Sequence, residues 1–332
     1  MTRISIGDAS LTNILARQGA ELRSQVQRAS QEVASGRYSD IGAAVRGDFS
    51  PLLAIDASLS RLAAYKSNTT DAAFQTAAQQ SAITGLSDLA SGISTTLLAA
   101  KTTSTPAQIA TLGADAKGRL ASAIGLLNTQ AAGRAVFSGT ATDTLPLGSV
   151  EDMLAALQTA AAGTTTAGQV ASAVNAWFAD PLGFGAFYQG DTALSPTPIA
   201  AGEAAEISTT ATDQALRDTL GGFAMAALID RGVLAGDASE RAALAQQAGQ
   251  QLMSTEDART TLAARIGTVE AQIEAARTRN SAEETSLGIL RSDIGAVDPY
   301  EAATRLQTVE SQLEALYLVT SRVSRLNLAE YL

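Results

Sequence analysis

Adjacent carboxylates are the side chains of this sequence that could most directly carry general acid–base catalysis. Such pairs occur at Glu151-Asp152, Glu256-Asp257 and Glu283-Glu284. Neighbouring residues on a helix point to different faces, so this spacing does not by itself bring two carboxylates together. We interpret these acids as solvated helix surface.

The sequence lacks the residue types on which many other catalytic and metal sites depend. Its 332 residues include no His and no Cys, which excludes Ser-His-Asp and Cys-His catalysis, His- or Cys-ligated zinc and disulfides. Gly183 and Gly185 begin a dinucleotide-loop pattern without its third glycine, and no loop has the Gly-Lys-Ser/Thr ending of a P-loop. We therefore predict no enzyme activity, catalytic residue, cofactor or metal.

Charge and hydropathy argue against two classes of partner. The chain has 33 acidic and 23 basic residues, a net charge of −10, which disfavours nucleic acid because phosphates attract clustered Lys and Arg. No apolar stretch reaches the roughly 18 residues that a membrane span requires. The N-terminal segment also lacks the continuous apolar region of a cleaved secretory signal. We expect neither nucleic-acid binding nor membrane insertion.

Hydrophobic periodicity predicts a mainly α protein, because apolar residues recur at steps of three and four on both sides of a central segment. No proline occurs from about residue 236 to 294, so we predict one long helix there. That stretch contains a heptad seam typical of coiled coils: Leu262, Ile266, Val269, Ile273, Ala276, Asn280, Glu283, Leu287, Leu290 and Ile294.

The central segment, residues 141–210, differs from its surroundings. It holds four of the seven prolines and seven acidic residues, but no Lys or Arg. Prolines interrupt helices, and the aromatic residues gathered here supply core volume. We predict a small mixed α/β insert domain with its own core. The segments on either side are expected to form a long antiparallel helical or coiled-coil rod.

Both ends of the chain are short amphipathic helices with few large apolar residues. Isolated helices of this size are marginal in water. We therefore expect them to pair with each other and with further copies, and to be weakly ordered until they assemble. The predicted subunit-interface residues are Leu11, Ile14, Leu15, Leu22, Val26, Val33, Leu306, Val309, Leu313, Leu316, Val323, Leu326, Leu328, Tyr331 and Leu332.

Several short motifs resemble the flagellin superfamily. Residues 133–140 read GRAVFSGT and precede a Thr-Asp-Thr run, which is similar to the G-R-x-x-F-S-G-[ST]-x-T-D-T pattern of that superfamily. Residues 187–191, FYQGD, resemble its Y-x-G-D segment, and residues 32–37, EVASGR, its N-terminal motif. Residues 326–332, LNLAEYL, are similar to the end of the hook–filament junction branch, which the chain resembles most.

The resemblance implies an organisation and a role. Residues 1–45 with 299–332 would form a terminal coiled-coil tube domain, 46–140 with 211–298 a helical rod domain, and 141–210 an outward-facing insert. The chain would be a structural subunit of the hook–filament junction that self-associates in a ring. It would contact the other junction protein, flagellin and, through its C-terminal helix, an export chaperone. It would lie in the extracellular flagellum after type III export without a cleaved signal peptide.

Two alternatives stay open. One is a flagellin, the subunit of the filament, although flagellins more often end without the Tyr-Leu pair of this chain. The other is a cytosolic coiled-coil adaptor, which would lack both the mixed insert and the terminal motif.

Overall fold

The computed structural model describes residues 6–101 and 103–329 and divides into two compact units. One unit comprises residues up to Arg61 together with those from Ala282 onward, and the other comprises Leu62–Ser281. Long helices dominate both units. Strands in the described residues form only small two-stranded sheets, so the prediction of a mainly α fold with a small mixed insert is confirmed.

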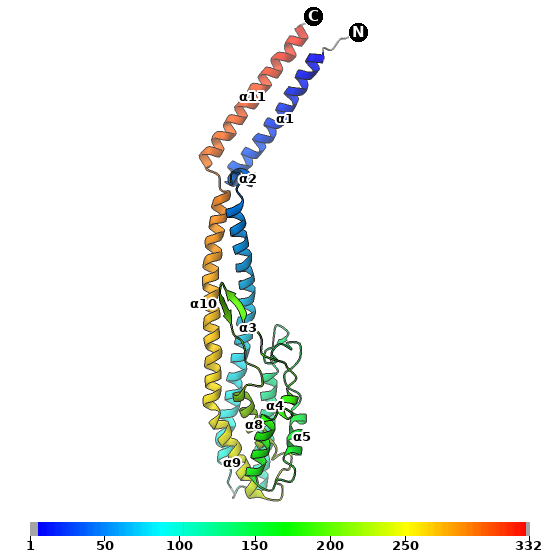
Figure 1. Cartoon of the computed structure of the whole chain (residues 1–332), viewed down its shortest axis with the longest axis vertical. Coiled ribbons are helices and arrows are strands. Elements are labelled where there is room, and N and C mark those ends of the chain that lie inside the picture. Colours follow the sequence, from blue (N-terminus) through cyan, green and yellow to red (C-terminus); the bar gives the residue numbers. More distant parts are fainter. Residues whose placement is uncertain (1–5, 102, 330–332) are drawn as a thin grey trace. The chain divides into compact units, whose positions relative to one another are not determined.

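The first unit is built around two terminal helices. Helix α1 (Ile6–Ser35) and helix α11 (Pro299–Ala329) pack against each other and run antiparallel (Figure 1). Asp298 caps α11, since its Oδ1 accepts the amides of Tyr300 and Glu301 at 2.8 and 3.1 Å, and Pro299 suits the first turn. The unit also contains the short helix α2 (Ile41–Ala44).

The linkers beside these helices pair with each other. The Tyr38 amide donates to the Gly295 carbonyl at 3.0 Å, and the Val297 amide donates to the Gly36 carbonyl at 3.0 Å. Beyond them lie the first turns of α3 (Ser50–Leu98) and the last turns of α10 (Glu256–Gly295), which an Asp56–Arg291 ion pair connects at 2.8 Å. Segments from opposite ends of the sequence are therefore joined at several levels of this unit.

The larger of two buried clusters in the second unit is centred on α8 (Gln214–Ala227), most of whose residues are buried. Helices α4 (Pro106–Leu127), α5 (Val150–Ala160), α6 (Ala167–Ala179) and α9 (Ala238–Ser254) surround it, together with part of α3. Close packing depends on small residues: Gly222 of α8 lies against Leu252 of α9, where a Cβ would come within 2.7 Å of a leucine methyl carbon.

The prediction that the insert has its own core is wrong. Met153, Leu157, Val174 and Phe178 of the insert belong to the same buried cluster as α4, α8 and α9. Trp177 of α6 meets Phe178 of α6 and Phe184 of the short helix α7 (Phe184–Phe187) edge to face, with ring centroids 5.0 and 6.1 Å apart. A segment of this size buries more apolar surface by packing on the neighbouring helices than by closing on itself.

The two sheets are small antiparallel hairpins. Strand β1 (Gln130–Ala131) pairs with β2 (Arg134–Ala135), and β3 (Thr197–Ala200) pairs with β4 (Glu203–Ala205). The β3–β4 hairpin lies across α3 and α10 (Figure 1), and Ile199 and Ala205 form a second buried cluster with Ala72, Ile273 and Ala276. The hairpin therefore fastens two helices that are far apart in sequence.

The predicted single helix over residues 236–294 is also wrong. Helix α9 ends at Ser254 and α10 begins at Glu256, with Thr255 between them. Arg259 is buried, and both of its terminal nitrogens lie 3.2 Å from the Leu252 carbonyl, while Nη1 also donates to Thr255 Oγ1 at 2.6 Å. The guanidinium therefore donates to a carbonyl in the last turn of α9, where the regular hydrogen bonds of the helix end.

The heptad seam is buried only in its first part. Leu262, Ile266, Ile273, Ala276 and Asn280 are buried as expected, but Glu283 and Leu290 are exposed.

Candidate subunit-interface surfaces

The terminal helices meet along a narrow seam. Gly19 allows a close approach, since a Cβ there would lie 3.5 Å from a methyl carbon of Leu316. Val309 is buried, and Ala29 and Ala302 of the two helices are also buried. Other predicted interface residues on these helices are half-buried: Leu15, Leu22, Val26, Leu306, Leu313, Leu316 and Val323.

The remaining predicted interface residues lie elsewhere. Leu11, Ile14 and Val33 of α1 are 41–45% exposed, so they face away from the seam at least in part. Leu326 and Leu328 belong to α11, but their side chains are outside the described residues. Tyr331 and Leu332 also lie outside the described residues.

A second set of apolar side chains on α11 points outward. Tyr317, Leu318 and Val319 are 53, 68 and 49% exposed. Consecutive residues on a helix are about 100° apart, so these three cover much of the circumference that the seam leaves free. The heptad pattern did not reveal them because they lie between its positions, although a run of three apolar residues was a visible signal.

A buried carboxylate ties the two helices together near their linkers. Glu32 of α1 is only 6% exposed. Its Oε2 accepts from Arg305 Nη1 of α11 at 2.9 Å, and its Oε1 accepts from the Ser39 amide and hydroxyl at 3.0 and 2.9 Å. Both carboxylate oxygens are thus satisfied inside the helix pair.

Arg305 completes this cluster, which we call the Glu32–Arg305 cluster. Its Nη2 donates to Glu301 at 3.0 Å, and its guanidinium carbon lies 5.7 Å from the centre of the Tyr38 ring. Burial alone would lower the pKa of Arg305, but Tyr38, Glu301 and Glu32 more than offset that effect and raise this pKa above its usual value. The cluster holds one helix to the other by charge. Sequence analysis missed it because Glu32 and Arg305 are 273 residues apart.

Two of the sequence motifs pack directly against each other in the second unit. The Asp191 amide donates to the Ser138 carbonyl and the Thr140 amide to the Thr192 carbonyl, both at 2.9 Å. The Tyr188 hydroxyl lies 3.2 Å from the Phe137 carbonyl oxygen. The GRAVFSGT and FYQGD segments therefore meet in one packed contact.

Gly139 is required at this junction. It has φ +61°, and a Cβ there would collide with the Thr192 carbonyl oxygen. Burial raises the pKa of the neighbouring Tyr188 above its ordinary value.

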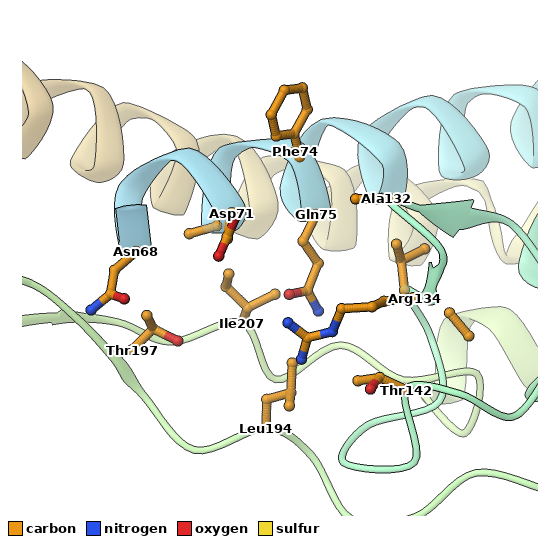
Figure 2. Close-up of a pocket in the computed structure, with 14 residues that line it drawn as sticks. Asn68, Asp71, Phe74, Gln75, Ala132, Arg134, Thr142, Leu194, Thr197 and Ile207 are labelled. Carbon is orange, nitrogen blue, oxygen red and sulfur yellow. The ribbon is translucent and has the colours of Figure 1, made fainter. Parts of the chain in front are cut away.

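An open pocket lies between α3, the β1–β2 hairpin and residues at the start of and on either side of the β3–β4 hairpin. Its volume is about 290 Å³, and its walls include Ala72, Val136, Leu194 and Ile207. Figure 2 shows the Arg134 side chain extending across it between Gln75 and Leu194. In the part of the chain that the structure describes, the Arg134 guanidinium forms no ion pair.

Two structural observations bear on other functions. Among residues 6–101 and 103–329, no three acidic side chains gather closely enough to hold a metal ion. The described helices also include none with the length and apolar character that a membrane crossing needs.

Comparison with known proteins links the C-terminal part of the chain to flagellins. Residues 246–332 match the family model of the bacterial flagellin C-terminal helical region, which confirms the resemblance to the flagellin superfamily on this segment. A candidate flagellar hook-associated protein from Vibrio parahaemolyticus is similar in structure, with 16% identity and a TM-score of 0.49. The similarity covers 73% of this chain and 95% of that one. No curated protein sequence matches the chain.

Proposed function

We propose that this protein is a structural subunit of the bacterial flagellum, located at the hook–filament junction, and that it self-associates in a ring through its terminal helices. The observation that carries this proposal is the outward-facing apolar side chains on the α1–α11 pair. A helix that is apolar on more than the side it buries needs further partners. Tyr317, Leu318 and Val319 give α11 this property, and Leu11 and Ile14 extend it to α1.

The match to the flagellin C-terminal helical region supports the same reading. It covers all of α10 and α11 and the second half of α9. We propose that the ring contacts the other junction protein on one side and flagellin on the other. An export chaperone would cover the apolar faces of α11 before assembly, and the chain would leave the cell by type III export.

The proposal is a structural role without catalysis. The ends of the chain would form the ring, with the seam residues Leu15, Leu22, Leu313 and Leu316 joining the two helices of one copy. The exposed residues would join neighbouring copies. A contact of this kind is heterologous, and it closes into a ring or continues as a helical assembly according to its rotation.

A substitution at Leu318 tests the proposal. Leu318 is 68% exposed, so Leu318→Asp leaves the fold of the monomer intact while placing a charge on the proposed contact between copies. In a flagellated strain whose own gene is replaced, we expect export of the variant but filaments that fail to attach to the hook. Gln312→Asp, at an exposed polar position of the same helix, is the matched control and should swim normally.

Two results would contradict the proposal. Normal swimming of the Leu318→Asp strain would show that this surface is not needed to attach the filament. Immunogold label spread along the whole filament, rather than confined to its proximal end, would remove the junction assignment.

The match to a flagellin region also supports a second candidate, a subunit of the filament itself. Seeded polymerisation separates the two, because a flagellin extends seeds into long filaments whereas a junction protein does not. A cytosolic coiled-coil adaptor is a weaker alternative, which presence of the protein in cells and its absence from shed flagella would favour.

A further inference from the structure

One turn on the surface of the second unit presents an aliphatic side chain almost completely to solvent. Leu182 is 86% exposed, more than any other large apolar residue recorded in the described part of the chain. It lies between α6 and α7 in the sequence Ala179-Asp180-Pro181-Leu182, and each of these residues is exposed. We call these four residues the Leu182 turn.

The Leu182 turn is held in one conformation. The Leu182 amide donates to Asp180 Oδ1 at 2.9 Å, and the amides of Gly183 and Gly185 donate to the Asp180 carbonyl at 3.0 and 3.2 Å. Gly183 passes so close to Trp177 that a Cβ would collide with the Trp177 carbonyl oxygen. The backbone that carries Leu182 is therefore fixed before any contact, so binding has to order only the side chain, which favours its use as an anchor.

The pocket beside Arg134 has the properties that such an anchor requires. Its volume of about 290 Å³ is roughly twice that of an engineered apolar cavity that takes up benzene, so it can hold a leucine together with a proline. Ala72, Val136, Leu194 and Ile207 supply apolar walls. Leu182 does not line this pocket, so the two features are separate surfaces of the same unit.

The pocket offers one positive group with which an incoming acid can pair. The pocket contains one guanidinium, that of Arg134, and one carboxylate, that of Asp71, and neither forms an ion pair within the described residues. The Leu182 turn carries Asp180, and the insert around it contains no Lys or Arg. An incoming acid is therefore favoured only on the Arg134 side of the pocket, which fixes the orientation of the turn.

We propose that the Leu182 turn of one copy docks into the Arg134 pocket of a second copy, with Leu182 and Pro181 in the cavity and Asp180 paired with Arg134. The partner copy thus completes a pocket that one copy leaves open. Because turn and pocket are different surfaces, the contact is heterologous and can repeat from copy to copy. This inference rests on the proposed function in one respect only, namely that copies of the chain lie side by side.

Cross-linking of cysteine variants tests the contact, since the natural sequence has no Cys to give a background. One full-length chain carries Ala179→Cys, which leaves Leu182 and Asp180 in place, and another carries Ala132→Cys at the pocket. The two chains are mixed and treated with a short thiol–thiol cross-linker. Ala162→Cys, another exposed loop alanine, replaces Ala132→Cys in the control mixture.

We expect dimers between the Ala179→Cys and Ala132→Cys chains to form about tenfold faster than dimers in the control mixture or homodimers of either variant. Adding Leu182→Ser to the first chain should slow the reaction about tenfold, because the buried leucine is lost. Arg134→Glu on the second chain should also slow it, because a glutamate there repels Asp180, whereas Arg134→Lys should keep most of the rate.

Equal rates in the two mixtures would overturn the proposal, as would an unchanged rate when the second chain carries Arg134→Glu. These results are independent of the terminal helices. If the Leu318→Asp strain loses its filaments while the cross-linking shows no preference, the proposed function stands and this contact is refuted. If the Leu318→Asp strain swims normally while the cross-linking shows the expected preference, the proposed function is refuted and this contact stands.

Discussion

Replacing Glu32 with alanine tests what holds the two terminal helices together. The substitution removes the acceptor of Arg305 Nη1 at 2.9 Å and leaves the Ser39 amide and hydroxyl without their partner. Breaking a fully buried ion pair costs about 3–5 kcal/mol. The cost here is lower because the Arg305 side chain is 37% exposed and keeps its bond to Glu301. We therefore expect a loss of about 2–3 kcal/mol, close to that of one charged hydrogen bond and one orphaned donor.

Hydrogen exchange on the full chain is the suitable assay, because the loss concerns local opening of the helix pair rather than unfolding of the whole molecule. A loss of 2–3 kcal/mol corresponds to roughly 30- to 150-fold faster exchange of the amides in α1 and α11. Amides of α4 and α8, which belong to the other unit, should exchange at unchanged rates.

Glu21→Ala is the matched control. Glu21 is an exposed acid on the same helix, so its removal should change exchange by less than about twofold. Unchanged exchange of α1 and α11 in Glu32→Ala would refute the role of the cluster. A double-mutant cycle with Arg305→Ala should give a coupling free energy smaller than the loss in the single variant, because the two bonds from Ser39 to Glu32 are lost whether or not Arg305 is present.

Further predictions concern the second unit. Gly139→Ala places a Cβ on a residue with left-handed backbone, where it collides with the Thr192 carbonyl oxygen. The substitution should lower the free energy of unfolding by about 3 kcal/mol or more, measured by chemical denaturation. Tyr188 has a folded pKa above its ordinary value of 10.0, mainly because of burial, so its contribution to stability is complete below pH 10 and is lost as pH rises through the folded pKa. Tyr188→Phe should therefore reduce the alkaline loss of thermal stability. Asn280→Ala leaves the Ile199 carbonyl without its 2.7 Å donor and should speed amide exchange in the β3–β4 hairpin about tenfold or more.

The parts of the fold that depend on local periodicity were predictable. Leu262, Ile266, Ile273 and Ala276 repeat at coiled-coil spacing and are buried, because a regular helix must turn such a row toward its partner. The same rule placed Val309 in the terminal seam. The heptad pattern alone could not show where the seam of α10 ceases to be buried. Leu290 is 49% exposed although the heptad continues through it.

The features that depend on distant residues were not predictable. No proline or glycine marks the end of α9, and the decisive group is the buried guanidinium of Arg259, which bonds the Leu252 carbonyl. Nor does the sequence indicate that Glu32 meets Arg305, because a lone acid on an amphipathic helix is normally solvated. The insert was identified by its composition, whereas the absence of a separate core follows from packing against α8.

The β3–β4 hairpin has a consequence for the order in which the chain acquires its structure. Its buried cluster joins Ala72, Ile199 and Ile273, and Asn280 fixes the Ile199 carbonyl. Closing contacts over such a separation is entropically costly and slow. In a polypeptide delivered N-terminus first, whether from a ribosome or through a narrow conduit, the hairpin can contact only α3 until α10 is present. We therefore expect the hairpin to dock late in folding. In a refolding time course, the amides of β3 and β4 should gain protection from exchange after those of α4.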